Sequence, residues 1–330
     1  MNRGARVAIA IVGWCACVGV ACARDAFFAP DGKTVTLITS SGLGSVNIET
    51  GIVTLIALPK VLKAAEIQSI ARGAHGEILF LAQGAVWVLE GQGPVHQICK
   101  TTLLLQATDL LVVTREDSSV KNWMLVSASE KASAPGGARE PELTLYGRKP
   151  RGQEFGAISC RRTPNVTCGT FTQDGRFFFV CEGDVWEGYL SAEPDEDPNS
   201  SMGVLTAARV APLSVLSTDF SNAGAMSVVD VAVAGKWMYV VLHGHHMGAI
   251  VRAPMPAHRL DGVPSVTEQY QLMAQVLAKA EVITEDGEYS SNFCVSEVNG
   301  KTQLFWTQRR NIMLWEGKGE LKVAGQLPEP

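Results

Sequence analysis

The stretch FFAPDGKTVTLI, Phe27 to Ile38, consists of a short apolar run, a Pro-Asp-Gly-Lys corner and a second apolar run. Glycine in such a corner permits the positive φ angle that a tight turn between antiparallel strands requires. Similar corners recur at Gly76, Gly175, Gly235 and Gly300, each followed by a charged residue and an apolar or aromatic run. The corner therefore marks a repeated unit and not a single hairpin.

The spacing of the corners indicates the length of the repeated unit. Counted from Gly32, the separations are 44, 99, 60 and 65 residues, and a degenerate unit at 110–128 divides the longest of them. Trp87 and Trp186 each stand 11 residues after the glycine of their own corner, and Asn311 to Leu321 occupies the same place in the last unit. Each unit therefore predicts four short strands joined by three turns, with the recurring tryptophans in the core.

The segment from Phe27 to Leu58 resembles a blade of the PD40, YVTN and NHL class of β-propellers. In that class a Pro-Asp-Gly-Lys corner joins the first two strands and a Thr-Gly turn joins the last two. The resemblance implies an all-β chain that forms a single β-propeller with four antiparallel strands in each blade. The blades are expected at 25–60, 67–100, 104–160, 166–212, 226–275 and 291–326.

Six blades are expected, and a seventh remains an alternative. It would lie between Leu213 and Gly224 or in Thr267 to Ala280, which also has a helical pattern of apolar residues. An open all-β sandwich is the other alternative for the fold. The last unit ends with its own outer strand, ELKVAG, and the first begins with an inner strand. We therefore expect the ring to close by packing of sheet faces, without a strand exchanged between the first and last blades.

The first residues have the pattern of a secretory signal. Met1 to Arg6 is basic, and Val7 to Ala23 carries no charge and ends on small residues. We predict a signal peptide at 1–23 and the propeller domain at 24–330. An uncleaved membrane anchor is one alternative, although this run is slightly shorter than the ~20 residues that cross a bilayer. A lipoprotein signal that ends before Cys22 is the other, and a lipid on Cys22 would then hold the chain at the membrane. Each interpretation places the domain outside the cytoplasm, in the periplasm or secreted.

Composition excludes several functions. The net charge of −5 and the pI near 5.7 argue against a nucleic-acid surface, which requires a concentrated basic face. The sequence contains no Gly-x-Ser-x-Gly, no His-Glu-x-x-His and no phosphate-binding loop, so it predicts no catalytic residue and no cofactor. We expect a monomeric, non-enzymatic module that binds a protein or peptide partner in the cell envelope or serves there as a scaffold.

Cysteines in the fourth blade predict a disulfide. If the turn at Asp174 and Gly175 has two residues, Cys168 and Cys181 face each other at a non-hydrogen-bonded pair, where a bridge can form. A bulged turn would shift the register by one residue and favour Cys160 with Cys168 instead. Both pairings, and the absence of any bridge, stay open.

The resemblance also implies which face binds ligands. In such propellers the loops that join second to third strands lie on one face, commonly the binding one. We expect this face to carry the insert from Ser129 to Glu142 and six candidate binding residues. These are His243, His245, His246, Arg309, Arg310 and Asp184. The arginines suit a carboxylate or phosphate partner, and whether the histidines bind a metal stays open.

An enzyme is the alternative function. A six-bladed propeller hydrolase or lactonase would hold a metal in the central channel with Glu, Asn or Asp side chains from several innermost strands. The candidates are Asp25, Asp230, Asn292 and Glu297, and the sequence does not determine which of them face inward.

Overall fold

The computed structural model describes residues 25–63, 66–73, 75–91, 93–114, 119–129, 143–152, 154–161, 166–167, 169–172, 176–192, 203–211, 226–244, 248–257, 266–286, 290–317 and 320–329. These residues form 24 strands, a 3-10 helix at Thr102–Gln106 and the α-helix α1 (Val266–Leu277). No helix in these ranges is long and apolar enough to span a membrane.

The strands follow one another in antiparallel groups of four. The first three groups are β1 (Ala26–Phe28), β2 (Thr34–Thr39), β3 (Gly42–Asn47) and β4 (Val53–Leu55); β5 (Ile67–Arg72), β6 (Ile78–Ala82), β7 (Ala85–Leu89) and β8 (His96–Lys100); and β9 (Ala107–Val112), β10 (Met124–Ser129), β11 (Leu143–Arg148) and β12 (Gly156–Arg161). The last three are β13 (Gly169–Phe171), β14 (Phe177–Cys181), β15 (Asp184–Ala192) and β16 (Gly203–Ala211); β17 (Ser227–Ala234), β18 (Trp237–His243), β19 (Gly248–Pro254) and β20 (Glu281–Asp286); and β21 (Ser290–Val298), β22 (Lys301–Gln308), β23 (Asn311–Glu316) and β24 (Lys322–Gln326).

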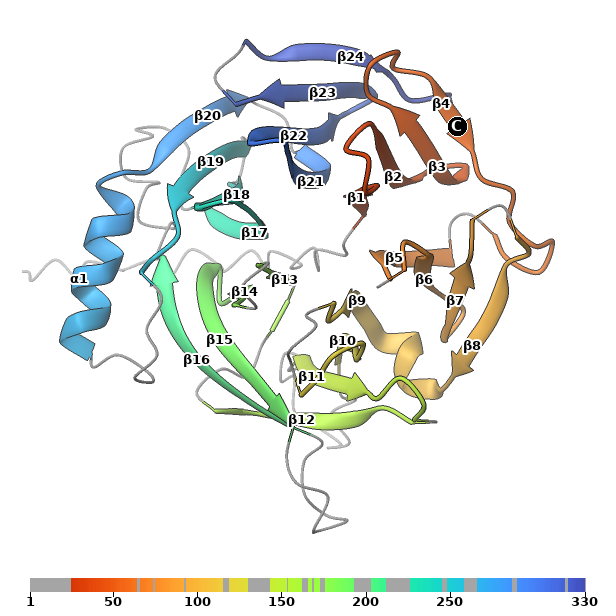
Figure 1. Ribbon diagram of the computed structural model, residues 1–330, viewed down its shortest axis with the longest axis horizontal. Coiled ribbons are helices and arrows are strands. Elements are labelled where there is room, and N and C mark those ends of the chain that lie inside the picture. The colour runs from red at the N-terminus through yellow and green to blue at the C-terminus, as the bar shows by residue number, and fades with distance from the viewer. Residues whose placement is uncertain are drawn as a thin grey trace, which may run out of the picture.

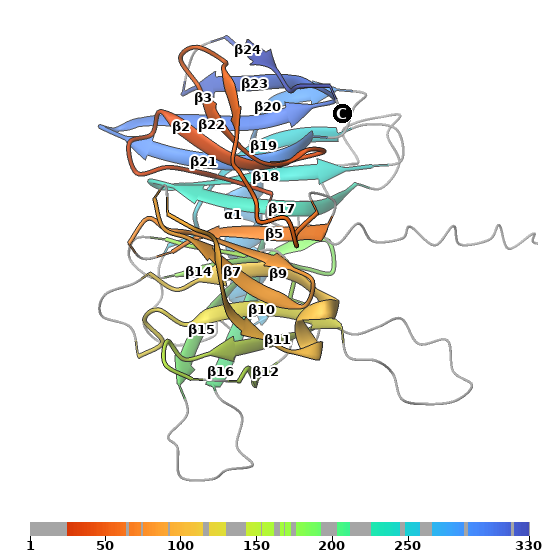
Figure 2. The ribbon, with the colours of Figure 1, turned by 90° about the vertical axis from the view of Figure 1, so that its right-hand side faces the viewer.

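The groups are arranged as the blades of a β-propeller (Figure 1). The first strand of each group lies nearest the centre and the fourth lies at the rim, while α1 packs outside the ring. Viewed from the side, the strands run across the thickness of the disc (Figure 2). We call the groups the first to sixth blades in chain order. The segment 212–225, where a seventh blade was an alternative, lies outside the described residues.

The fifth blade corrects one predicted boundary. The sequence placed its end at 275, but its fourth strand is β20, which begins at Glu281. The helical pattern in Thr267 to Ala280 forms α1, which is inserted between the third and fourth strands of this blade. Met273 and Val276 are the buried residues of the helix, so one apolar stripe attaches it to the rim. The apolar residues of Thr267 to Ala280 recur with the period of a helix, and no corner glycine precedes β20. The strand that ends this blade was therefore not recognised from the sequence.

The glycine corners have the predicted geometry. Gly32, Gly76, Gly235 and Gly300 adopt φ angles of +64°, +87°, +54° and +71°, in the region that glycine enters without steric cost. Gly175 lies outside the described residues. All four corners join a first to a second strand and therefore lie on one face of the disc, which we call the corner face.

The recurring tryptophans share one hydrogen bond. Nε1 of Trp87 donates to the carbonyl oxygen of Ala82, and Nε1 of Trp186 donates to that of Cys181, at 3.1 Å in both cases. Each indole therefore ties its third strand to the end of its second strand, five residues earlier in the chain. In the sixth blade Met313 occupies the matching register position, and Trp315 is buried two residues further along the same strand. The predicted structural role is confirmed for Trp87 and Trp186, which are partly buried against the apolar clusters, whereas the predicted equivalence of Trp315 is wrong.

Apolar clusters fill the boundaries between neighbouring blades. Within the described residues there are six, and each draws on the facing sheets of two adjacent blades. One of them joins the first blade to the sixth, where Phe28 and Phe305 meet edge to face with ring centroids 6.5 Å apart. β1 and β24 pair within their own blades, so the ring closes by packing without an exchanged strand, as expected.

A side chain of the sixth blade also bonds the backbone of the first. In the orientation that satisfies its amide, Nδ2 of Asn292 donates to the carbonyl oxygens of Asp25 at 3.1 Å and of Ile38 at 3.2 Å. Its Oδ1 lies 2.9 Å from the hydroxyl oxygen of Thr307. Asn292 is buried and adopts a φ of +52°. It therefore links the innermost strands across the boundary where the ring closes.

The rims of the third and fourth blades are joined differently. β12 and β16 pair in parallel, with Ile158 opposite Gly203 and Arg161 opposite Thr206. This pairing merges the two blades into one sheet of eight strands, while the other blades remain separate sheets of four. It also satisfies backbone groups that would otherwise face water at two exposed edges.

The register of the fourth blade bears on the predicted disulfide. Gly169 lies opposite Phe179 and Phe171 opposite Phe177, which is one residue off the register that a two-residue turn would produce. The premise for pairing Cys168 with Cys181 is therefore wrong. No disulfide joins any two of the described cysteines, which include Cys160 and Cys181, and Cys168 lies outside the described residues.

The closing boundary should be sensitive to added side-chain volume at Gly51. A Cβ atom there would lie 2.1 Å from the carbonyl oxygen of Ala324 in the sixth blade, and the φ of Gly51 is +68°. Gly300 has a φ of +71°, similar to that of Gly51, but no atom lies within 4 Å of a Cβ added there. The variant Gly300→Ala therefore measures the cost of backbone strain without a steric clash. We expect Gly300→Ala to lower the free energy of unfolding by about 1–2 kcal/mol. Gly51→Ala should lower it by about 2 kcal/mol more, as measured by urea unfolding. Equal losses of unfolding free energy in the two variants would show that the first and sixth blades leave room for a methyl group at Gly51.

Candidate functional site

Two cavities open at the centre of the ring and share part of their walls. One has a volume of about 260 Å³ and the other about 410 Å³, and Phe27, Arg72 and Thr170 line both. The remaining walls come mainly from the innermost strands of the blades. The ring therefore places side chains from distant parts of the sequence around one axial channel.

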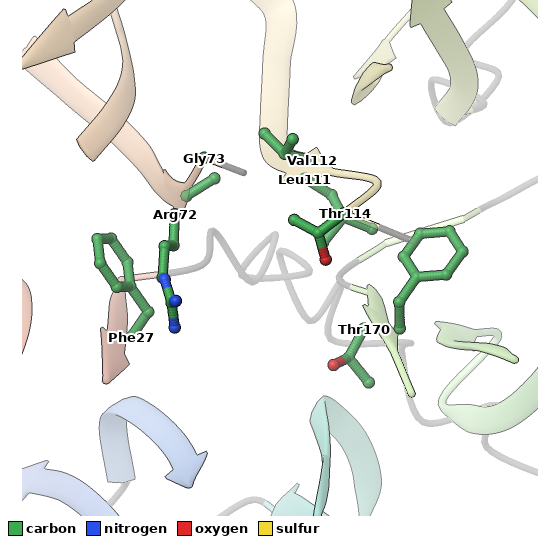
Figure 3. A pocket seen from close by; sticks show the side chains of 9 residues that line it. Phe27, Arg72, Gly73, Leu111, Val112, Thr114 and Thr170 are labelled. Atoms are coloured by element: carbon green, nitrogen blue, oxygen red, sulfur yellow. The ribbon is translucent and has the colours of Figure 1, made fainter. Parts of the chain in front are cut away.

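Arg72 is the cation among the described residues that line these cavities. It ends β5, and its guanidinium points into the open space between Phe27, Thr114 and Thr170 (Figure 3). Within the described part of the chain, no carboxylate or carbonyl pairs with it. Glu297 lines the larger cavity from the sixth blade. Because the innermost strands run toward the corner face, Arg72 lies at that mouth of the channel.

Carboxylates lie toward the opposite mouth. Asp25 precedes β1, and Asp109 and Asp230 lie in the first halves of β9 and β17. Burial, together with the negative charges of Asp230 and Asp109, raises the pKa of Asp25 to about 7. Each of the other two carboxylates is therefore close enough to Asp25 to disfavour its ionised form. One mouth of the channel thus carries carboxylates, and the other carries Arg72 together with Glu297.

Backbone hydrogen bonds orient two of these carboxylates. Oδ1 of Asp109 accepts from the Leu110 amide at 2.9 Å and from the Ser69 hydroxyl at 3.3 Å, which links the second and third blades. Oδ1 of Asp230 accepts from the Val231 amide at 2.7 Å. The polar groups near this mouth thus also hold adjacent innermost strands together.

Irregular pairing accompanies these polar residues. Four innermost strands show a register shift near their start. The shifts lie between Ile67 and Ser69 in β5, beside Thr108 in β9, between Val228 and Asp230 in β17, and between Ser291 and Cys294 in β21. A bulge changes the direction in which the following side chains point. Repetition of the shift in four blades explains how Ser69, Asp109, Asp230 and Asn292 come to surround one mouth of the channel.

The candidate residues on the loops between second and third strands lie on the face opposite the corners, as the resemblance implied. His243 ends β18, Arg309 and Arg310 form the turn after β22, and Asp184 begins β15. His245 and His246, with residues 130–142 of the predicted insert, lie outside the described residues.

Asp184 and Arg310 form contacts within the propeller. Asp184 is buried and forms an ion pair with Arg209 of β16. Arg310 forms an ion pair with Glu329 at 3.0 Å and donates from Nη2 to the carbonyl oxygen of Leu327 at 3.0 Å. Arg310 thus holds the C-terminal segment against the sixth blade. These contacts supply an internal role for each residue, and their predicted role in binding stays a prediction.

The donors required by the hydrolase alternative are not assembled in the described residues. There, no three His, Cys, Asp or Glu side chains lie close enough together to hold one ion. Asn292 directs its amide at backbone carbonyls of the first blade, and Glu297 lies at the other mouth from Asp25 and Asp230. These side chains therefore do not fit a metal centre of that kind.

Sequence reasoning missed Arg72 and Asp109. A signal for Arg72 was present, because IQSIAR ends an otherwise uncharged innermost strand with a charge. Asp109 likewise interrupts the apolar run ATDLLV. A charge within an innermost strand indicates a channel position, since the faces of that strand are otherwise buried between blades.

Comparison with known proteins supports the fold. No protein-family model and no curated protein sequence matches the chain. The structure is similar to a gluconolactonase from Xanthomonas campestris, with a TM-score of 0.53 and 11% identity over 92% of this chain and 86% of that one. It is also similar to a streptogramin B lyase, with a TM-score of 0.50 and 9% identity over 94% of this chain and 84% of that one. This likeness shows the β-propeller fold.

The raised pKa of Asp25 predicts a dependence of stability on pH. The carboxyl keeps its proton up to about pH 7 in the folded chain, whereas the unfolded chain releases it near pH 4. Stability contributed by this group is therefore complete below about pH 4 and is lost as the pH rises through 7. We expect Asp25→Asn to be as stable as the wild type at pH 4 and more stable at pH 8, by up to about 4 kcal/mol.

Urea unfolding at several pH values between 4 and 8 measures this difference. Glu90→Gln, which removes an exposed carboxylate, is the control and should follow the wild type. The backbone carbonyl of Asp25 that accepts from Asn292 is retained in Asp25→Asn. A parallel pH dependence of the wild type and Asp25→Asn would contradict the prediction.

Proposed function

We propose that this protein is a non-enzymatic β-propeller that binds a carboxylate-bearing segment of a protein or peptide at the mouth of the channel on its corner face. The observation that carries the proposal is the guanidinium of Arg72. It projects into a central cavity and has no partner among the described residues. A charged group held in this way is available to a ligand.

The surroundings of Arg72 suit a carboxylate. A guanidinium forms two parallel hydrogen bonds to a carboxylate, which is stronger and more directional than contact with a point charge. The hydroxyls of Thr114 and Thr170 lie across the cavity and can bond a neighbouring polar group of the ligand. Phe27 provides an apolar wall, and Glu297 disfavours a second negative charge on its side of the mouth. This combination fits a peptide that carries one carboxylate beside apolar atoms.

The cavity is large enough for a side chain or a chain end but not for a folded domain. Its two parts have volumes of about 260 and 410 Å³. Pockets for small ligands generally have volumes of ≈ 300–1,000 Å³. An acidic side chain or a C-terminal carboxylate of the partner would therefore enter the mouth, while the rest of the partner contacts the rim of the channel.

The hydrolase alternative is supported by the fold, which is shared with a gluconolactonase and a streptogramin B lyase. Metal analysis of the purified chain distinguishes it from the binding proposal. A stoichiometric ion that is lost when His245 and His246 are both replaced by Ala would favour the hydrolase.

We also propose that the protein acts outside the cytoplasm as a monomer. The support for the location is the uncharged run from Val7 to Ala23 that follows a basic start. A partner in the cell envelope is consistent with this placement.

Peptide binding tests the role of Arg72. The probe is a pool of random hexapeptides with free C-terminal carboxylates, compared with an amidated pool that lacks Asp and Glu. We expect the wild type to retain the first pool in preference, because its carboxylates pair with the guanidinium. Arg72→Met should lose this preference by about tenfold or more, and Arg72→Lys should keep part of it. Equilibrium dialysis with mass spectrometry measures the retained peptides.

Arg309→Met serves as the matched control, because Arg309 lies on the face opposite the corners. It should retain the peptides like the wild type. Loss of binding in Arg309→Met with normal binding in Arg72→Met would move the site to the face first predicted from the sequence. Equal retention of the two pools by the wild type would contradict carboxylate recognition altogether.

A further inference from the structure

A second arginine, Arg148, lies inside the boundary between the second and third blades. It ends β11 and is 7% exposed. In the sheet register it stands opposite Met124, and cross-strand partners share a face. Met124 and Tyr146 belong to the apolar cluster that packs against the second blade. Because alternate residues of a strand face the same side, Arg148 points with Tyr146 toward that blade.

The guanidinium of Arg148 has no acceptor among the described residues. Its Nε and Nη1 atoms are buried, and neither donates a hydrogen bond. Arginine does not lose its proton in proteins, so the charge persists. An isolated buried charge is costly unless a counter-charge or hydrogen-bond acceptors accompany it. The third blade thus presents a cation to an apolar boundary without a negative partner.

The positive charge of Arg148 acts on the thiol of Cys99, which belongs to β8 of the second blade. Burial raises the pKa of its thiol, and the nearby positive charge of Arg148 lowers the pKa by a smaller amount. The thiol therefore stays protonated and does not supply the missing negative charge. It provides a weak S–H donor instead, and Cys99 packs against the same apolar cluster as Met124 and Tyr146.

We propose that Arg148 and Cys99 form an inorganic anion site of chloride size, which joins the second and third blades. The site is independent of Arg72 and of the function proposed above. A small monovalent anion suits it because Nε and Nη1 are donors without acceptors and the thiol adds a weak donor. The anion would neutralise the guanidinium where the neighbouring side chains of both blades are apolar. It would stabilise the folded chain in proportion to its concentration.

Thermal unfolding in sodium chloride and in sodium gluconate at equal ionic strength tests the site. Gluconate is the comparison anion because it is too large for a buried site. Chloride at 0.15 M should raise the Tm of the wild type by about 3–6 °C over gluconate. Arg148→Met removes the charge and should show no difference between the salts. Arg151→Met is the matched control, since Arg151 is exposed in the turn that follows β11, and it should respond like the wild type.

Bromide provides a second measurement that does not depend on a variant. Crystals of the wild type soaked in sodium bromide should show an anomalous peak beside the guanidinium of Arg148. A chloride response that persists in Arg148→Met would assign the effect to another site and overturn the proposal. Absence of the bromide peak, or equal Tm values of the wild type in both salts, would also overturn it.

Discussion

Apolar contact between neighbouring blades is the interaction on which the rest of the structure depends. A blade of four short strands has two apolar faces, and each face is removed from water only by the next blade. The apolar clusters occupy successive boundaries and include the one between the first and sixth blades. At roughly 25 cal/mol for each Å² of apolar surface buried, the ring gains stability from all its boundaries together. Loss of one boundary would expose two faces at once.

The same constraint explains where polar chemistry is possible. Side chains that face a neighbouring blade must be apolar or fully satisfied, so free polar groups are restricted to the channel, the turns and the rim. The channel shows this most clearly, because charged side chains gather at both of its mouths. Asp25, Asp109 and Asp230 gather near one mouth, and Arg72 stands at the other. Arg148 departs from this rule, since it places a charge at a blade boundary.

The sequence predicted the fold from features that are local. A corner glycine such as Gly300 indicates a positive φ angle at its own position. Trp87 and Trp186 recur at the same position of the repeated unit. Blade limits followed from these marks, except in the fifth blade, where α1 separates β19 from β20. The register of β13 and β14 could not be predicted, because it depends on turn geometry at the tip of the hairpin.

The candidate site was much less accessible to sequence reasoning, because the channel is assembled from strands far apart in the chain. Asp25 and Asp230 were recognised as candidates, but their facing depends on register shifts that leave no mark in the sequence. The same shifts direct Asn292 toward the first blade and away from a metal role. Arg72 was missed because a single charged residue at the end of a strand is usually interpreted as a solvent-exposed side chain.

The parallel pairing of β12 and β16 has a consequence for how the molecule opens. Amide protons on these two rim strands are bonded across the blade boundary, so they exchange with solvent only when both blades separate or unfold. The third and fourth blades therefore behave as one cooperative unit. The remaining boundaries lack a shared backbone ladder, so we expect transient opening of the ring to occur there first.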